Sequence, residues 1–406
     1  MALTISQVGG WDLATLSGTA TELTASSGTL TANASAVINE LDRVSPDWEA
    51  EAYTAAAVVA KDRAGQMNER SERWKRAALI LDEASEQIGL LKQEITATAQ
   101  DFFLKSLFDF ADDGSVSVSA GHLARIAAAY PDDTEGFESA LKSAERSAAQ
   151  LEDKLKTLLM TADLAAQRYD WRVEGALLGL TEVDRPFVPR ISSPPPQPAG
   201  PIAGANEDGS GPDDYNTHSP DLAEQIYLQG LRAAAKTGGF ATGGNLEMAS
   251  DMLDHFFDNS GHDYKVDVNG MIKDMDDYKT ANKDDATGNY LLAASNMPVG
   301  YSGPVAFQGD WQGGSRGFRA DPLEHPDYWA ALGTVSYQTS GVAIPDENGK
   351  MEIQYRSSIY DYYNWDSTKK SPSEQYSDLN ELHRAGWAQN YAVTGTSDAF
   401  EFGYPS

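Results

Sequence analysis

The chain contains no cysteine among its 406 residues. This absence excludes disulfide bonds, thiolate metal ligands and a cysteine nucleophile. At this length we expect two or three domains, with at least one sizeable hydrophobic core.

Basic residues are also scarce. The chain has 31 Lys and Arg residues against 61 Asp and Glu residues, which gives a formal net charge of -30 at pH 7. Nucleic acids and anionic membrane surfaces both bind clustered Lys and Arg. The charge balance therefore argues against either partner, and it favours solubility and a location outside the cytoplasm.

Long apolar runs are missing as well. No run of about 18 apolar residues occurs, so we expect no membrane span. The opening residues, MALTISQVGGWDLATL, lack a basic stretch followed by an apolar one, so we expect no Sec-type signal peptide. A secreted or cell-envelope protein with this sequence is expected to travel without a cleaved leader.

The first half carries small or apolar residues at steps of three and four, which is the seam of a helix packed on another helix. We expect one helix from Leu13 to Val44, a second from about Trp48 to Phe110, and a third through Phe137 to Tyr169. The second helix has a ladder of seven-residue steps: Met67, Trp74, Leu81, Ile88, Ile95 and Phe102. The pattern predicts an elongated all-α hairpin or coiled-coil bundle.

The stretch VSPDWEAEAY interrupts the seam with turn residues and a large aromatic, Trp48. Two helices joined by a turn that holds a Trp resemble the WXG family, the helical-hairpin substrates of actinobacterial type VII (ESX) secretion. The family's Trp-x-Gly stands here as Trp48-Glu49-Ala50, and the opening around Trp11 is similar to longer mycobacterial relatives. The resemblance covers residues 1–180.

This resemblance implies that Trp48, Glu49, Ala50 and Trp11 contact a type VII secretion component or a helical partner protein. The family's composite export signal adds Tyr-x-x-x-Asp/Glu beyond a helix end; the match in this chain is Tyr362 with Asp366, in the second half. The plainer interpretation is an ordinary helical hairpin that Trp48 staples together. Such a helical surface also suits assembly into a homo-oligomer.

A segment dense in Pro, Gly, Ser and Asp separates two parts of the chain. Its consecutive prolines favour extended polyproline II, and the Gly/Asp stretch after them favours flexibility. We therefore predict a helical domain at 1–182, a linker at 183–219 and a further domain at 220–406.

The second half alternates between helical and strand periodicity, which indicates an α+β domain. Segments 334–344 and 350–360 alternate with period two and flank PDENG, a good hairpin turn. An amphipathic helix in DLNELHRAGWAQ and a final strand follow. We expect a small antiparallel sheet with a helix packed on it.

Tests for common chemistry in this half are mostly negative. GDWQGGSRGF has the glycines of a phosphate loop without its strand, helix or Lys. In DVNGMIKDMDD, Met271 and Tyr278 stand where calcium needs carboxylates, and the histidines lack zinc-site spacing. We therefore expect no metal and no cofactor.

One set of residues can carry chemistry. Asp361 and Tyr363 lie at a strand end, Asp366 follows, and His383-Arg384 lie on the next helix. Carboxylates, a phenol, an imidazole and a guanidinium together suit a phosphoester. The order resembles the Asp-x-Tyr-Asp…His-Arg motif of colicin M-type bacteriocins, which cleave a lipid-linked peptidoglycan precursor, with Asn364 in place of the second acidic residue. The plainer interpretation is a strand end and the wet face of a helix.

Three functions remain open. The chain is a secreted effector with a helical export or partner-binding module and an α+β binding domain, which is the reading that we favour. Alternatively, the second domain is an enzymatic antibacterial toxin, or the whole chain is a non-secreted scaffold. The sequence leaves open whether the protein is an enzyme and favours a binding role.

Overall fold

The computed structural model describes residues 3–44, 50–181, 184, 187–189, 215–236, 246–346, 349–365 and 375–404. The chain forms two compact units. The first, called here the helical unit, comprises Met1–Ser192 and Leu292–Ala306. The second, called here the α+β unit, comprises Ser193–Leu291 and Phe307–Ser406. This composition agrees with the predicted fold class, long helices followed by an α+β region.

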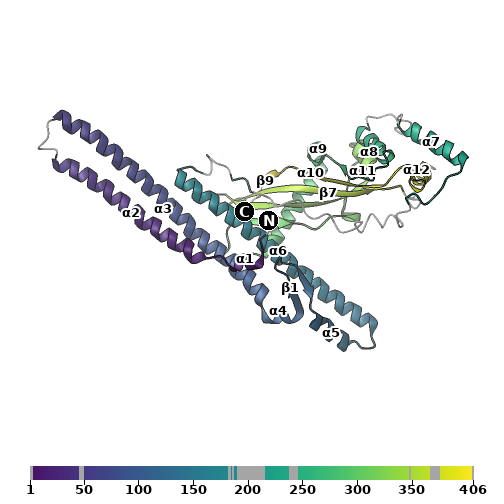
Figure 1. The fold of residues 1–406 in the computed structure, drawn as a ribbon, viewed down its shortest axis with the longest axis horizontal. Helices are drawn as coiled ribbons and strands as arrows, with labels where there is room; N and C mark the ends of the chain where they lie inside the picture. Colours follow the sequence, from purple (N-terminus) through teal and green to yellow (C-terminus); the bar gives the residue numbers. More distant parts are fainter. Residues whose placement is uncertain are drawn as a thin grey trace. The chain divides into compact units, whose positions relative to one another are not determined.

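Two long helices dominate the helical unit, α2 (Leu13–Val44) and α3 (Ala50–Gln100). They lie side by side (Figure 1) and run antiparallel, because the Ser27 hydroxyl meets the Ser71 hydroxyl while the Ser85 hydroxyl reaches the carbonyl of Leu13. The buried residues of α2 recur every seven residues: Ala20, Ser27, Ala34 and Leu41. Small side chains at this spacing let the two helix axes approach closely.

The second helix ends earlier than the periodicity predicts. α3 stops at Gln100, and the Asp101 side chain accepts a hydrogen bond from the amide of Leu104, which caps a new short helix, α4 (Phe102–Leu107). Phe102, predicted to lie in the seam, is 90% exposed because it follows this break. A small antiparallel hairpin follows, β1 (Phe108–Phe110) with β2 (Val116–Val118).

The remaining helices of this unit are α1 (Ile5–Gly9), α5 (Ala120–Ala129) and α6 (Thr134–Leu178). The predicted stripe of α6 is confirmed, since Ala148, Leu155, Ala162 and Tyr169 are all buried. The segment 292–306 also packs in this unit. The amide of Ser302 donates to the Gln87 side chain at 2.8 Å, and the amide of Ala306 donates to the Thr161 hydroxyl at 3.1 Å.

The α+β unit is built on one mixed sheet. Its strand order is β3-β8-β7-β6-β4, with β5 beside β6 and β9 beside β7. The strands are β3 (Tyr264–Lys265), β4 (Val305–Gln308), β5 (Phe318–Arg319), β6 (Thr334–Pro345), β7 (Met351–Tyr363), β8 (Tyr391–Thr396) and β9 (Phe400–Tyr404). β7 pairs antiparallel with β6, β8 and β9, whereas β3 and β8 run parallel.

The β6–β7 hairpin closes at the predicted PDENG turn. Asp346 and Lys350 exchange hydrogen bonds across it, from the amide of Asp346 to the carbonyl of Lys350 and from the amide of Lys350 to the Asp346 carboxylate. Gly349 has φ 77, a left-handed value that side chains rarely adopt. The turn fixes a register that runs from Pro345 opposite Met351 to Ser336 opposite Tyr360.

Helices accompany this sheet: α7 (Leu222–Lys236), α8 (Glu247–Phe257), α9 (Val268–Asp274), α10 (Asp276–Ser295), α11 (Pro326–Leu332) and α12 (Gln375–Arg384), with a 3-10 turn, η2 (Gly314–Arg316). The core joins Phe256 of α8, Met271 of α9 and Leu382 of α12 to Ile359 of β7 and Val393 of β8. The helices therefore cover the face of β7 that carries Ile359.

Within the described part of the chain, every helix is too short or too polar to cross a lipid bilayer.

Candidate functional site

The WXG-like segment stands in the sequence between the two long helices. α2 ends at Val44 and the antiparallel α3 begins at Ala50, the last residue of that segment. Trp48 and Glu49 lie outside the described residues. Their predicted contact with a secretion component or helical partner stays a prediction.

Trp11, the other residue of this prediction, lies in the turn between α1 and α2. Its amide donates to the carbonyl of Val8 at 3.2 Å, and the Lys92 ammonium donates to its carbonyl at 2.6 Å. The indole is half-buried and packs against the core of α3 and α6. Trp11 is therefore held from both its backbone and its ring.

Asp361 and Tyr363 lie near the end of β7 on one face, because side chains two residues apart in a strand point the same way. Asp361 is opposite Val393 of β8, and Tyr363 is opposite Tyr391. The rings of Tyr363 and Tyr391 stack, with centroids 4.9 Å apart and planes 16° apart. This is also the face of Ile359, so both residues lie on the side that the helices cover.

Tyr391 anchors this group. Its hydroxyl donates to the carbonyl of Met252 at 2.6 Å, and the His255 ring meets it edge-on at 4.6 Å. Burial raises the pKa of the Tyr391 phenol, and the nearby Tyr363, Tyr264 and Asp361 raise it further. Tyr391 therefore stays neutral, and Asp361 lies close enough to interact with it electrostatically.

His383 is buried, with only 1% of its surface exposed. Its Nδ1 lies 3.3 Å from the carbonyl of Ala388 and 3.3 Å from the amide of Asn390. The Tyr215 ring lies beside the imidazole, with centroids 5.4 Å apart. The interpretation that His383 lies on the solvent-exposed face of its helix is therefore wrong, because the loop after α12 folds back over the helix end.

The structure brings His383 and Tyr363 to the same short stretch of chain. His383 contacts the backbone of Ala388 and Asn390, and Tyr363 stacks on the next residue, Tyr391. Asp361 lies two residues before Tyr363 on β7. Stretch 388–391 thus connects the β7 end to the end of α12.

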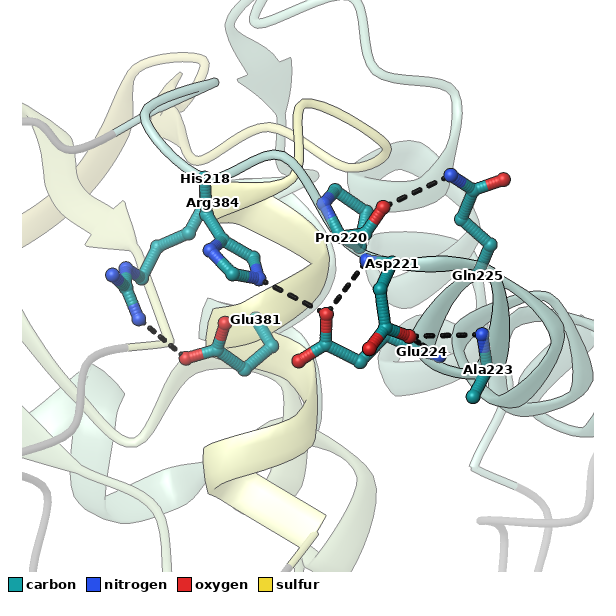
Figure 2. Close-up of polar contacts among 8 residues, drawn as sticks. All are labelled: His218, Pro220, Asp221, Ala223, Glu224, Gln225, Glu381 and Arg384. Atoms are coloured by element: carbon teal, nitrogen blue, oxygen red, sulfur yellow. Dashed lines mark hydrogen bonds and ion pairs between the residues drawn. The ribbon is translucent and has the colours of Figure 1, made fainter.

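Arg384 lies at the end of α12 and faces outward more than His383 does. Its guanidinium pairs with Glu381 at 2.6 Å (Figure 2), and its side chain is 37% exposed. Its carbonyl accepts a hydrogen bond from the amide of His218 at 2.9 Å. The predicted fifth residue, Asp366, lies outside the described residues.

Residues 215–218, called here the strap, run along the end of α12. The amide of Asn216 donates to the carbonyl of His383 at 3.2 Å, next to the His218–Arg384 hydrogen bond. Beyond the strap, Asp221 and Glu224 form the capping pair of α7, and His218 lies 3.5 Å from Glu224 (Figure 2). The sequence analysis did not predict the strap. The cap that follows it has a recognisable signal, because Asp-x-x-Glu before an apolar run is typical of a helix start.

The arrangement offers a carboxylate near the end of β7, and a buried imidazole and a guanidinium at the end of α12. The Arg384 guanidinium pairs with Glu381, and a guanidinium is the side chain best suited to a phosphate group. In the ranges that the structure describes, no three His, Asp or Glu side chains come together as a metal site. The groups present suit proton transfer and anion binding.

Comparisons with known proteins give one weak likeness. No protein-family model and no curated protein sequence matches the chain. Among solved structures, PaeM, a colicin M-like bacteriocin produced by Pseudomonas aeruginosa, is similar at a TM-score of 0.25 and 12% sequence identity. The match covers 73% of this chain and 99% of the bacteriocin. At that TM-score the likeness establishes neither a shared fold nor a shared function.

Proposed function

We propose that the chain is a secreted effector whose helical unit is read by a type VII (ESX) secretion component or a helical partner protein. The observation that carries this proposal is the antiparallel pair α2 and α3, between which the Trp48-Glu49-Ala50 segment stands in the sequence. A parallel run of α2 and α3 would have removed the basis for the resemblance to WXG-type hairpins.

Exposed apolar residues near the reversal support a partner-binding role. Val58 and Val59, two turns into α3, are 66% and 61% exposed. Adjacent exposed valines on a helix give apolar surface for a partner helix to cover. They lie close in sequence to Trp48, so one partner can contact both.

The test is export from an actinobacterial host with an intact ESX apparatus. The tagged full chain is expected in the culture medium, and Trp48→Arg is expected to hold it in the cells. Leu79→Arg is the matched control, because Leu79 is 69% exposed on α3, far along the helix from the reversal. The proposal would be overturned if a strain without any ESX apparatus released as much wild-type chain into the medium as the intact host does.

A second candidate function is hydrolysis of a phosphoester by the α+β unit. The observation that favours it is that Asp361 and Tyr363 share one face of β7, while His383 and Tyr363 flank the same stretch 388–391. The resemblance to the colicin M-type motif points to a lipid-linked peptidoglycan precursor as substrate.

In this reaction Asp361 takes a proton from an attacking water molecule. The water oxygen bonds to phosphorus, the bond from phosphorus to the leaving oxygen breaks, and the leaving oxygen takes a proton from solvent. Arg384 pairs with the non-bridging phosphate oxygens. His383 acts as a positioning residue, since its contacts to Ala388 and Asn390 hold the stretch beside Tyr363.

Toxicity tests this candidate. The full chain, directed to the periplasm of a Gram-negative bacterium, is expected to lyse the cells, and Asp361→Ala is expected to relieve the lysis. Glu401→Ala is the control, because Glu401 is an exposed acid on β9 of the same sheet. Purified chain with the lipid-linked precursor in vesicles is expected to release a phosphorylated headgroup. Normal growth and an intact precursor would rule out the activity.

A further inference from the structure

The helical unit contains a pocket that the proposed function does not use. It has a volume of about 330 Å³ and lies between the start of α2, the middle of α3 and the later part of α6. Apolar side chains line most of it, among them Leu16, Leu81, Ile88 and Val173. Pockets of roughly 300–1,000 Å³ between helices are the usual size for small organic ligands.

Hydrogen bonds hold the walls of this pocket in place. The turn at Trp11 is tied to α3 by Lys92, whose ammonium donates to the Trp11 carbonyl at 2.6 Å. On the facing wall, the Tyr169 hydroxyl donates to Glu83 at 3.1 Å. Trp11 and Tyr169 both line the pocket. The two aromatic walls are therefore preorganised, so little binding free energy is lost in ordering them around a ligand.

Two carboxylates, Asp12 and Asp170, complete the lining. Asp12 caps α2 by accepting hydrogen bonds from the amides of Ala14 and Thr15, so much of its capacity is used by the protein. The Thr15 hydroxyl donates to the same carboxylate at 2.6 Å and lowers the pKa of Asp12 most, and the positive charge of Lys92 lowers it slightly further. Asp12 is thus charged but largely compensated.

Asp170 is different. Its side chain is exposed, and it makes no hydrogen bond or ion pair with any other residue whose position the structure describes. Two arginines lie two residues from Asp170 in sequence. Arg172 is bound to Glu83 at 2.8 Å and lies over the Tyr169 ring at 5.5 Å, and Arg168 is buried. Asp170 therefore places a carboxylate at the pocket that is in no ion pair with the described part of the chain.

We propose that this pocket binds a small apolar cation, with its aliphatic or aromatic part against Leu16, Ile88 and Trp11 and its ammonium group beside Asp170. Burial of the apolar part supplies the affinity, and the carboxylate selects the sign of the headgroup. Anionic amphiphiles are repelled by Asp170. This binding site does not depend on the proposed function.

The experiment is calorimetric titration of the full chain with three probes of equal chain length: octyltrimethylammonium, octanol and octyl sulfate, each below its micellar concentration. One ammonium probe is expected to bind per chain, more tightly than octanol, with no saturable binding of the sulfate. Asp170→Asn should weaken the ammonium probe by about threefold to fivefold, as expected for one partly exposed carboxylate, and leave octanol unchanged. Glu145→Gln, an exposed acid on α6 away from the pocket, should change neither.

Filling the pocket separates this site from general attraction of cations to an acidic protein. Ala166 lines the pocket and is half-buried, so Ala166→Phe is expected to abolish saturable binding. Val173→Phe is a second filling variant, and far-UV circular dichroism shows that each is folded. Equal affinity for all three probes, or ammonium binding unchanged in both folded filling variants, would overturn the proposal. Absence of saturable binding to the wild-type chain would overturn it as well.

Discussion

The hydroxyl of Ser71 is the most informative place to perturb the α2–α3 hairpin. Ser71 and Ser27 are both fully buried at the seam. The Ser71 hydroxyl contacts the Ser27 hydroxyl at 2.9 Å, the Ser27 carbonyl at 3.0 Å and the Thr31 hydroxyl at 2.8 Å. Ser71→Ala removes all of these contacts without adding volume, so it reports on the seam alone.

The expected cost follows from the burial of each partner. Thr31 is exposed, so its hydroxyl turns to water with little loss. Both contacts to buried Ser27 are lost, at about 1 kcal/mol each. Alanine favours a helix over serine by about 0.5 kcal/mol. The helical unit should therefore lose about 1.5 kcal/mol, which lowers its Tm by about 3–6 °C for a unit of this size.

Thermal unfolding followed by far-UV circular dichroism measures this change, and hydrogen exchange of α2 peptides assigns it to the helical unit, since two units need not unfold together. Ser17→Ala is the matched control, because Ser17 is exposed on α2 and only the helix-propensity gain remains. If Ser71→Ala unfolds at or above the temperature of Ser17→Ala, the seam hydrogen bonds do not stabilise the hairpin and the reasoning fails.

Two further predictions concern the α+β unit. Burial raises the pKa of Asp285, so the native state holds its proton more tightly than the unfolded state and stability falls as the pH rises above the ordinary Asp value. In urea unfolding, Asp285→Asn should remove this part of the decline, which begins at about pH 4, and the exposed Asp284→Asn should not. A Cβ at Gly341 would lie 2.1 Å from the Gln354 carbonyl across the β6–β7 pair, so Gly341→Ala should lower the free energy of unfolding by about 3 kcal/mol. Gly288 on α10 has open space around it, so Gly288→Ala should be neutral or stabilising in the same assay.

Much of the helical unit could be predicted from sequence because its pattern is local. A helix that packs on another repeats its seam every seven residues, and Ala20, Ser27 and Ala34 show that repeat without any knowledge of the partner. The end of α3 was missed because the heptad ladder continues to Phe102 past the break. The signal that mattered was Asp101, a helix cap one residue before it.

The α+β unit was less predictable because its contacts are distant in sequence. The β6–β7 hairpin has a local turn and was confirmed. β3 is two residues long and pairs with β8, where Tyr264 is opposite Val393. Two residues carry no periodicity, so nothing in the sequence indicated this parallel pair. The packing of 292–306 in the helical unit escaped notice for a related reason, since polar contacts such as Ser302 to Gln87 leave no apolar pattern.

For the candidate site, alternation along β7 was enough to place Asp361 and Tyr363 on one face. The burial of His383 was not visible, because it depends on the return of the chain through Ala388 and Asn390 and on Tyr215. Helical periodicity describes one helix and cannot show what a loop lays over its end.

The strap changes how the α+β unit should be isolated. Sequence composition places the domain start at residue 220, after the strap, yet Asn216 and His218 bond to the last carbonyls of α12 and Tyr215 covers the His383 ring. A fragment that begins at residue 220 would lose both hydrogen bonds and expose a histidine that is 1% exposed in the whole chain. Changed behaviour of such a fragment would therefore report the missing strap as much as the chemistry of Asp361. Only a chain that retains Tyr215 gives a fair comparison between wild type and Asp361→Ala.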